Sequence, residues 1–140
     1  PKLVIADEPT PGLDPKLARR AMEHFRQLAD MGAAVLVITH DLELALETVD
    51  RVQVFYAGHT IEDALVDDFE REETLRHPYS RALWRAMPKH GFHYIGGVQP
   101  YVKDNLQGCP FAPRCDMASR ECQGEIPWKV SGSGYVRCIL

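Results

Sequence analysis

The feature that most constrains the fold is an apolar run close to the first residue, Leu3-Val4-Ile5-Ala6. A run that is apolar at every position is typical of a strand buried on both faces of a parallel sheet. Ala34–Ile38 is a second such run, and the amphipathic segment between them opens at Asp14-Pro15 with an N-cap and a helix-starting proline. This order predicts an α/β fold in which two parallel strands are joined by a right-handed helical crossover.

Shorter elements are expected beyond the second strand. A helix is predicted from about Leu42 to Thr48, and two strand-like runs on either side of Ala57-Gly58 predict a hairpin. The charged residues 66–75 are expected to be helical. Residues 78–87 form a further predicted helix, which opens with a proline and is closed by Pro88. Because two parallel strands make an incomplete sheet, we expect the sequence to be the C-terminal portion of a longer α/β domain.

A change of composition predicts a domain boundary near residue 88. From residue 89 onward the chain is rich in Gly, Pro and Cys and shows little periodicity. We therefore expect residues 1–88 to belong to the α/β domain and residues 89–140 to form a small, irregular, cysteine-rich module. Such a module needs something other than a large apolar core to hold it together.

Charge and hydropathy argue against two classes of function. The 16 basic and 20 acidic residues give a net charge of −4 and are scattered along the chain, so no basic cluster could neutralise nucleic-acid phosphates. No apolar run approaches the roughly 20 residues that a membrane-spanning helix requires. The first residues also lack the layout of a signal peptide. We therefore expect neither nucleic-acid binding nor membrane insertion.

Ionisable side chains follow both predicted parallel strands. Asp7 and Glu8 end the first strand, and His40 comes directly after the second, at the sheet edge where ligands of α/β proteins usually bind. There Asp7 could hold Mg²⁺, Glu8 could orient and deprotonate an attacking water, and His40 could contact a terminal phosphate. Taken singly, an Asp-Glu pair can equally be a helix cap, and a lone histidine can be a solvated loop residue.

Together these residues resemble the ABC ATPase family. Residues 3–8 resemble its Walker B motif, Gly12-Leu13-Asp14 its D-loop, and Thr39-His40-Asp41 its switch-histidine motif. The resemblance implies that Asp7 is the magnesium-side carboxylate and that Glu8 is the catalytic base. It further implies that His40 senses the γ-phosphate and that Asp14 acts across a dimer interface. ATP and Mg²⁺ are the implied cofactors.

Three motifs of that family do not occur in the sequence. There is no Gly-rich loop with Lys-Ser/Thr to cradle phosphates, no Q-loop and no Leu-Ser-Gly-Gly-Gln signature. We therefore expect ATP hydrolysis by the full-length protein, and we expect these 140 residues alone to be inactive.

Two further segments resemble one branch of the family. Residues 54–62 are similar to the hairpin of importer ATPases, and His77-Pro78-Tyr79 with the residues after it is similar to the His-Pro-Tyr segment of the oligopeptide, dipeptide and nickel importer group. Without the resemblance, the two segments could equally be an ordinary hairpin followed by a surface helix.

All four cysteines lie near the end of the sequence, as Cys109, Cys115, Cys122 and Cys138. Their spacing, C-x5-C-x6-C-x15-C, lacks the short C-x2-C pairs of zinc fingers and ferredoxins. Four thiolates can close a zinc site or an iron–sulfur cluster, and they can also remain free. The segment from Gly108 to Cys115 resembles the C-terminal extension of the same importer group, which implies a [4Fe-4S] cluster on these cysteines. Because the region has little apolar periodicity, we hypothesise that such a cluster has a structural role.

The resemblance implies the ATPase subunit of a peptide importer, bound at the cytoplasmic face of the membrane. It also implies several partners: a second ATPase subunit, transmembrane permease subunits and, indirectly, an extracytoplasmic substrate-binding protein. A nickel importer ATPase is one alternative. A metal-binding regulatory or interaction module, which would act independently of ATP, is the other.

Overall fold

The computed structural model describes residues 1–101 and 107–140. These residues form two compact units, Pro1–Val49 and Asp50–Leu140, which are described separately below. The mixed α/β character expected from the sequence is confirmed. The domain boundary expected near residue 88 concerns the organisation of the whole protein, and it stays a prediction.

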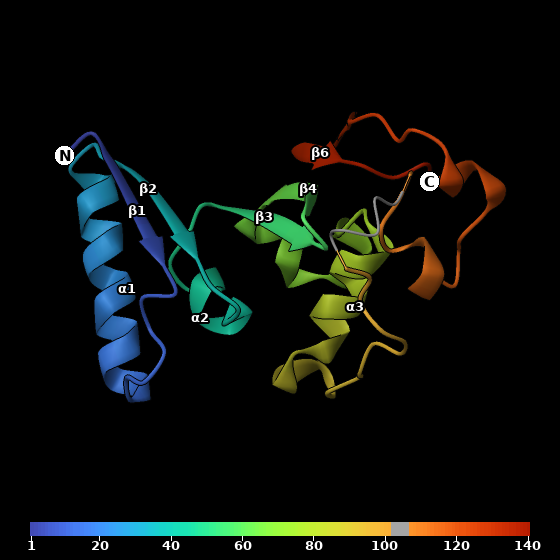
Figure 1. Ribbon diagram of the computed structural model, residues 1–140. Coiled ribbons are helices and arrows are strands. Elements are labelled where there is room, and N and C mark those ends of the chain that lie inside the picture. Colours follow the sequence, from blue (N-terminus) through green and yellow to red (C-terminus); the bar gives the residue numbers. More distant parts are fainter. Residues whose placement is uncertain (102–106) are drawn as a thin grey trace. The chain divides into compact units, whose positions relative to one another are not determined.

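The first unit is a parallel β-α-β unit followed by a short helix (Figure 1). Its elements, in chain order, are β1 (Leu3–Asp7), α1 (Pro15–Asp30), β2 (Ala34–Ile38) and α2 (Leu42–Leu46). Strands β1 and β2 pair in parallel, with Leu3 opposite Ala34 and Asp7 opposite Ile38. The two parallel strands and the helical crossover predicted from the sequence are confirmed.

Helix α1 packs against one face of this two-stranded sheet. Ala18 and Met22 of α1 are buried with Leu44 of α2, and Val37 of β2 packs against them. The alternate side chains of the strands face away and are exposed, including Ile5 at 60% and Leu36 at 47%. The expectation of strands buried on both faces is therefore wrong for the residues that the structure describes. Successive side chains of a strand point to opposite faces, and the helix covers one of them.

The second unit is built on an antiparallel hairpin of β3 (Arg51–Tyr56) and β4 (His59–Leu65). The expected turn at Ala57-Gly58 is confirmed, and both residues have positive φ, 45° and 83°. Such a two-residue turn matches the natural twist of a hairpin. Where a single helix was expected over residues 66–75, the chain forms two short 3-10 helices, η1 (Val66–Glu70) and η2 (Glu72–Thr74).

Helix α3 (Pro78–Ala86) follows as predicted, with His77 as its N-cap. Further short 3-10 helices in the part of the chain that the structure describes are η3 (Pro88–His90), η5 (Ala112–Arg114) and η6 (Arg120–Gln123). No helix within the described ranges is both long and apolar enough to cross a membrane.

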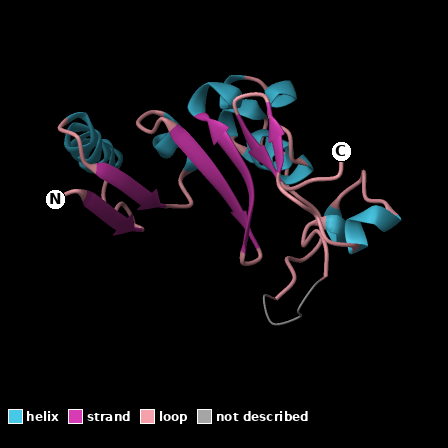
Figure 2. Cartoon of the chain, turned by 90° about the horizontal axis from the view of Figure 1, so that it is seen from above, coloured by secondary structure: helices cyan, strands magenta, loops and turns pink. Residues whose placement is uncertain are grey.

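Two short strands near the C-terminal end join the hairpin. They are β5 (Lys129–Ser131) and β6 (Gly134–Val136), and the four-stranded antiparallel sheet has the order β3-β4-β6-β5 (Figure 2). A side chain at Gly134 would collide with the Asp63 carbonyl oxygen, since a Cβ there would lie 2.0 Å from it. The cysteine-bearing region is thus not wholly irregular, because part of it completes a sheet that begins at Arg51.

Candidate functional site

The acidic end of β1 lies beside the end of β2. The backbone N–H of Glu8 donates to the Ile38 carbonyl at 2.8 Å, which continues the parallel ladder one residue past Asp7. Glu8 then turns sharply, with φ at 46° in the left-handed region. A non-glycine residue held in that region costs free energy, and such positions cluster at functional sites. Asp7 and Glu8 are both exposed.

The structure brings Glu8 and His40 together. His40 Nδ1 lies 3.0 Å from the Glu8 carboxylate, although the two residues are 32 positions apart in the chain. This hydrogen bond, together with the negative charge of Glu8, raises the pKa of His40 above its ordinary value of 6.5. The site therefore pairs the Glu8 carboxylate with an imidazole whose raised pKa favours the protonated form. Both groups lie at the sheet edge where the sequence predicted them.

Asp14 has a different place in the structure. Its Oδ1 accepts hydrogen bonds from the backbone N–H groups of Lys16 and Leu17, both at 3.0 Å, and so caps helix α1. This contact satisfies two of the donors that every helix leaves free at its N-terminus. The roles expected for Asp7 at a magnesium ion and for Asp14 across a dimer interface remain predictions.

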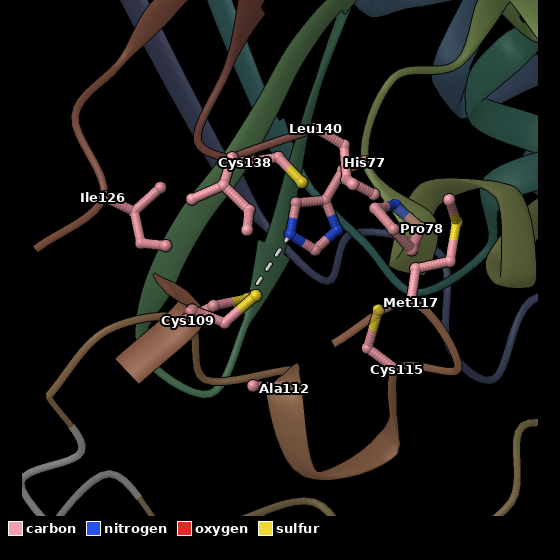
Figure 3. A pocket seen from close by; sticks show the side chains of 11 residues that line it. His77, Pro78, Cys109, Ala112, Cys115, Met117, Ile126, Cys138 and Leu140 are labelled. Carbon is pink, nitrogen blue, oxygen red and sulfur yellow. Dashed lines mark hydrogen bonds between the residues drawn. The ribbon is translucent and has the colours of Figure 1, made fainter. Parts of the chain in front are cut away.

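All four cysteines line one pocket of the second unit (Figure 3). None of the four forms a disulfide; Cys122 and Cys138 are buried, and Cys109 and Cys115 are partly exposed. Within residues 1–101 and 107–140, no three His, Cys, Asp or Glu side chains stand close enough together to hold a metal ion.

A close backbone approach brings Cys109 and Cys122 together in this pocket. The N–H of Cys109 donates to the Cys122 carbonyl at 2.8 Å. Gly108, just before it, has φ at 87°, and a Cβ there would lie 2.1 Å from the same carbonyl oxygen. Only glycine fits this position without moving the chain, both because of its φ and because of the contact.

Burial raises the pKa of the Cys109 and Cys115 thiols above their ordinary value of 9.0. For Cys109, hydrogen bonds from the backbone at Phe111 and Ala112 act in the opposite direction, and the other nearby sulfurs add to the increase. Such thiols are poor nucleophiles at neutral pH. They become ligands only when a metal displaces their protons.

His77 belongs to the same pocket, and reasoning from the sequence missed this. Its Nε2 lies 3.7 Å from the Cys109 sulfur, and its side chain is 1% exposed. Burial lowers its pKa to about 4, so the ring is neutral. Because 31 residues separate the two positions in the sequence, spacing gave no sign of the contact. The available signal was the joint presence of the His-Pro-Tyr and Cys-Pro-Phe segments.

Aromatic rings connect the three segments that the sequence singled out. The ring centroids of Tyr56, in the hairpin, and Tyr79, after His77, lie 4.5 Å apart. Phe111, in the cysteine segment, lies 5.4 Å from Tyr56 and 5.2 Å from Tyr79. Arg114 adds a hydrogen bond of 3.0 Å to the Tyr56 hydroxyl. The hairpin, the His-Pro-Tyr segment and the cysteine segment therefore form one packed structure.

Comparison with known proteins gives consistent matches along the chain. Residues 66–122 match the family model "Oligopeptide/dipeptide transporter, C-terminal region". A probable peptide ABC transporter ATP-binding protein of Sinorhizobium fredii is 41% identical over 91% of this chain and 39% of its own length. The dipeptide transport ATP-binding protein DppD of Haemophilus influenzae is 38% identical, over 99% of this chain and 43% of its own. For the oligopeptide transport ATP-binding protein AppD of Bacillus subtilis the identity is also 38%, over 100% and 44%.

The acidic strand end, its histidine and these matches define the class: the chain is related to the ATP-binding proteins of ABC transporters. Within that class it belongs to the oligopeptide/dipeptide transporter family, and its residues 66–122 match the C-terminal region of that family. The chain spans less than half the length of the curated relatives it matches, between 39% and 44% for the three named above.

Proposed function

We propose that this protein is the ATP-hydrolysing subunit of an ABC importer for oligopeptides or dipeptides. The contact that carries the proposal is the 3.0 Å pairing of His40 with Glu8 at the end of the parallel strands. The similarity to ATP-binding proteins of peptide transporters supports the substrate class. The activity is proposed for the full-length protein, because these 140 residues contain no phosphate-cradling Gly-rich loop and no signature motif. Alone, they are expected to be inactive.

Each residue of the strand edge has a proposed part in hydrolysis. The Glu8 carboxylate orients the attacking water and takes its proton, and His40 holds that carboxylate in place while its own proton faces a terminal phosphate. Asp7 would ligate Mg²⁺, which supplies charge neutralisation at the phosphates when bound. Asp14, fixed by its capping bonds, would face a second nucleotide-binding subunit.

The proposal places the subunit at the cytoplasmic face of the membrane as a peripheral protein. Its partners there would be a second ATPase subunit and the permease subunits, with a substrate-binding protein acting indirectly on the other side. Nickel is the alternative cargo. Competition of labelled dipeptide uptake by unlabelled peptides or by Ni²⁺, in vesicles containing the assembled transporter, would decide between the two cargoes.

Hydrolysis can be tested with a matched pair of substitutions in the intact protein. Glu8→Gln keeps the size of the side chain but removes the proton acceptor, so the steady-state ATPase rate should fall by about 100-fold or more. Nucleotide binding should be retained. Glu23→Gln, at an exposed position of helix α1, is the control and should leave the rate unchanged. Equal rates for the two variants would exclude Glu8 as the base.

We further propose that Cys109, Cys115, Cys122 and Cys138 hold a [4Fe-4S] cluster, with zinc as the alternative metal. Four free thiols line one pocket, and four thiolates are the donor set of either group. Within the described residues no three of these side chains yet stand close enough to hold a metal ion, so binding would have to draw the sulfurs together. A bound cluster would staple the loop segments that carry the cysteines. Iron, acid-labile sulfide and zinc contents of anaerobically purified protein would test this, and a folded, metal-free sample would refute it.

A metal-binding regulatory or interaction module is the second candidate function. The cysteine pocket is lined entirely by residues of the second unit, which favours it. Replacement of all four cysteines by serine distinguishes a regulatory role of this module from a structural one, and it leaves β6 in the sheet. Retained ATPase activity with lost partner binding would favour a regulatory module, and loss of both would favour a structural one.

A further inference from the structure

His77 is held at three points, one on its backbone and two on its ring. Its backbone N–H donates to the Glu62 carboxylate at 2.8 Å, and Glu62 itself is completely buried. Its ring Nδ1 accepts the backbone N–H of Tyr79 at 3.0 Å, in the N-cap geometry of helix α3. The ring also packs near Phe111, with 6.0 Å between centroids. Rotation of the ring would break a capping bond in a buried place.

These contacts decide which ring nitrogen carries the proton. A nitrogen that accepts an N–H has no hydrogen of its own, so Nδ1 is unprotonated. A buried, neutral imidazole then carries its single proton on Nε2. Nε2 is the nitrogen that faces the Cys109 sulfur at 3.7 Å (Figure 3), a distance suited to the longer hydrogen bonds of sulfur.

The same tautomer excludes His77 as a metal ligand at Nε2. Ligation there needs a lone pair, and the proton would have to move to Nδ1, where it would meet the N–H of Tyr79. We propose that His77 is a positioning residue of the cysteine site, where its Nε2–H donates a hydrogen bond to the Cys109 sulfur. The hydrogen bond itself needs no metal, and only its effect on a redox potential rests on the proposed cluster.

The hydrogen bond acts on one sulfur of the four. It stabilises negative charge on the Cys109 sulfur. Hydrogen bonds to ligating sulfurs are among the levers that set the potential of an iron–sulfur cluster, and each such donor favours the reduced form. The His-Pro-Tyr segment then has a physical meaning: Pro78 opens the helix, the Tyr79 N–H fixes the tautomer, and His77 presents its proton to the sulfur.

Two substitutions separate the bond to sulfur from the helix cap. In His77→Asn, the side-chain oxygen can still accept the Tyr79 N–H, since Asn is a preferred N-cap, but the side chain is too short to reach Cys109. In His77→Gln, the amide N–H reaches toward Cys109, but the cap is weakened. His90→Asn is the control, because the His90 ring stacks on Trp84 and is not part of the pocket lining.

The first measurement is the midpoint potential of the cluster in intact protein purified anaerobically. His77→Asn should lower it, with each tenfold loss of preference for the reduced form equal to about 59 mV for one electron. His77→Gln should restore it toward the wild-type value, and His90→Asn should leave it unchanged. If His77→Asn retains its cluster at the wild-type potential, or if Gln restores nothing, the proposal is overturned.

A second measurement applies if the wild type holds no cluster. That outcome would refute the proposed cofactor but not the hydrogen bond from His77 to Cys109. Histidine-selective ¹⁵N NMR of the intact protein reports the tautomer directly, and a proton on Nε2 of His77 is expected. The alkylation rate of Cys109 in metal-free protein should change several-fold in His77→Asn and recover in His77→Gln. A proton on Nδ1, or an alkylation rate equal to that of the wild type, would refute the hydrogen bond.

Discussion

Replacement of Gly108 by alanine tests the close approach that brings the cysteines together. The left-handed φ of 87° costs a residue with a side chain about 1–2 kcal/mol. The new Cβ would lie 2.1 Å from the Cys122 carbonyl oxygen and 2.8 Å from the backbone carbon of Gln123, so the two chain segments must separate. Loss of the hydrogen bond from Cys109 to Cys122 adds about 1 kcal/mol. The sum is about 2–3 kcal/mol.

The same loop provides a matched control. Gly124 has φ at −86°, an ordinary value for any residue, and a Cβ there would only touch the Glu121 carbonyl oxygen at 3.6 Å. Gly124→Ala should therefore change the free energy of local unfolding by about 0.5 kcal/mol at most, since it introduces neither backbone strain nor a steric clash.

Hydrogen exchange read by mass spectrometry is the suitable assay, because it measures opening of a single segment within the intact protein. Peptides that cover residues 107–124 should lose protection in Gly108→Ala and keep it in Gly124→Ala, while peptides of helix α1 report no change in either. Equal protection in the two variants would refute the argument from φ and from the 2.1 Å contact.

Three further predictions concern charged groups. The pKa of His40 should lie above its ordinary value in the wild type and fall in Glu8→Gln, as read by NMR. Since the pKa is raised, the contact is favoured below that pKa and lost as the pH rises through it. Glu62→Gln should destabilise the second unit by about 1–3 kcal/mol in urea unfolding, because it turns an amide toward a buried N–H. Asp14→Ala should destabilise helix α1 by about 1 kcal/mol, measured by hydrogen exchange.

Each of these has an outcome that contradicts it. An unchanged His40 titration in Glu8→Gln would remove the pairing as the cause of the raised pKa. Glu73→Gln, at an exposed position, is the control for Glu62→Gln, and equal midpoints for the two would show that the buried carboxylate is dispensable. Asp14→Asn should behave like the wild type, since Asn also caps helices well, and a loss equal to that of alanine would point to another role.

Local patterns were enough to predict the elements of the first unit and the hairpin turn of the second. Apolar runs, an N-capping Asp14 with the following proline, and the two-residue turn at Ala57-Gly58 are all readable within a few residues, and each element formed near its expected bounds. The placement of Glu8 and His40 at one sheet edge also followed from the sequence, because parallel neighbouring strands end on the same side. The chemistry of those residues was inferred by resemblance, and it remains to be tested.

The sequence by itself determined the longer helices, the four longer strands and which residue types are available, because capping, turn chemistry and periodicity act over short distances. Only the tertiary structure decided which strands and side chains contact one another in the second unit. There, three-residue strands pair with a distant hairpin, and the ring of His77 lies against Cys109. Such contacts depend on backbone approaches between segments dozens of residues apart. No local pattern encodes them, so the cysteine site acquired its histidine only when the chain had folded.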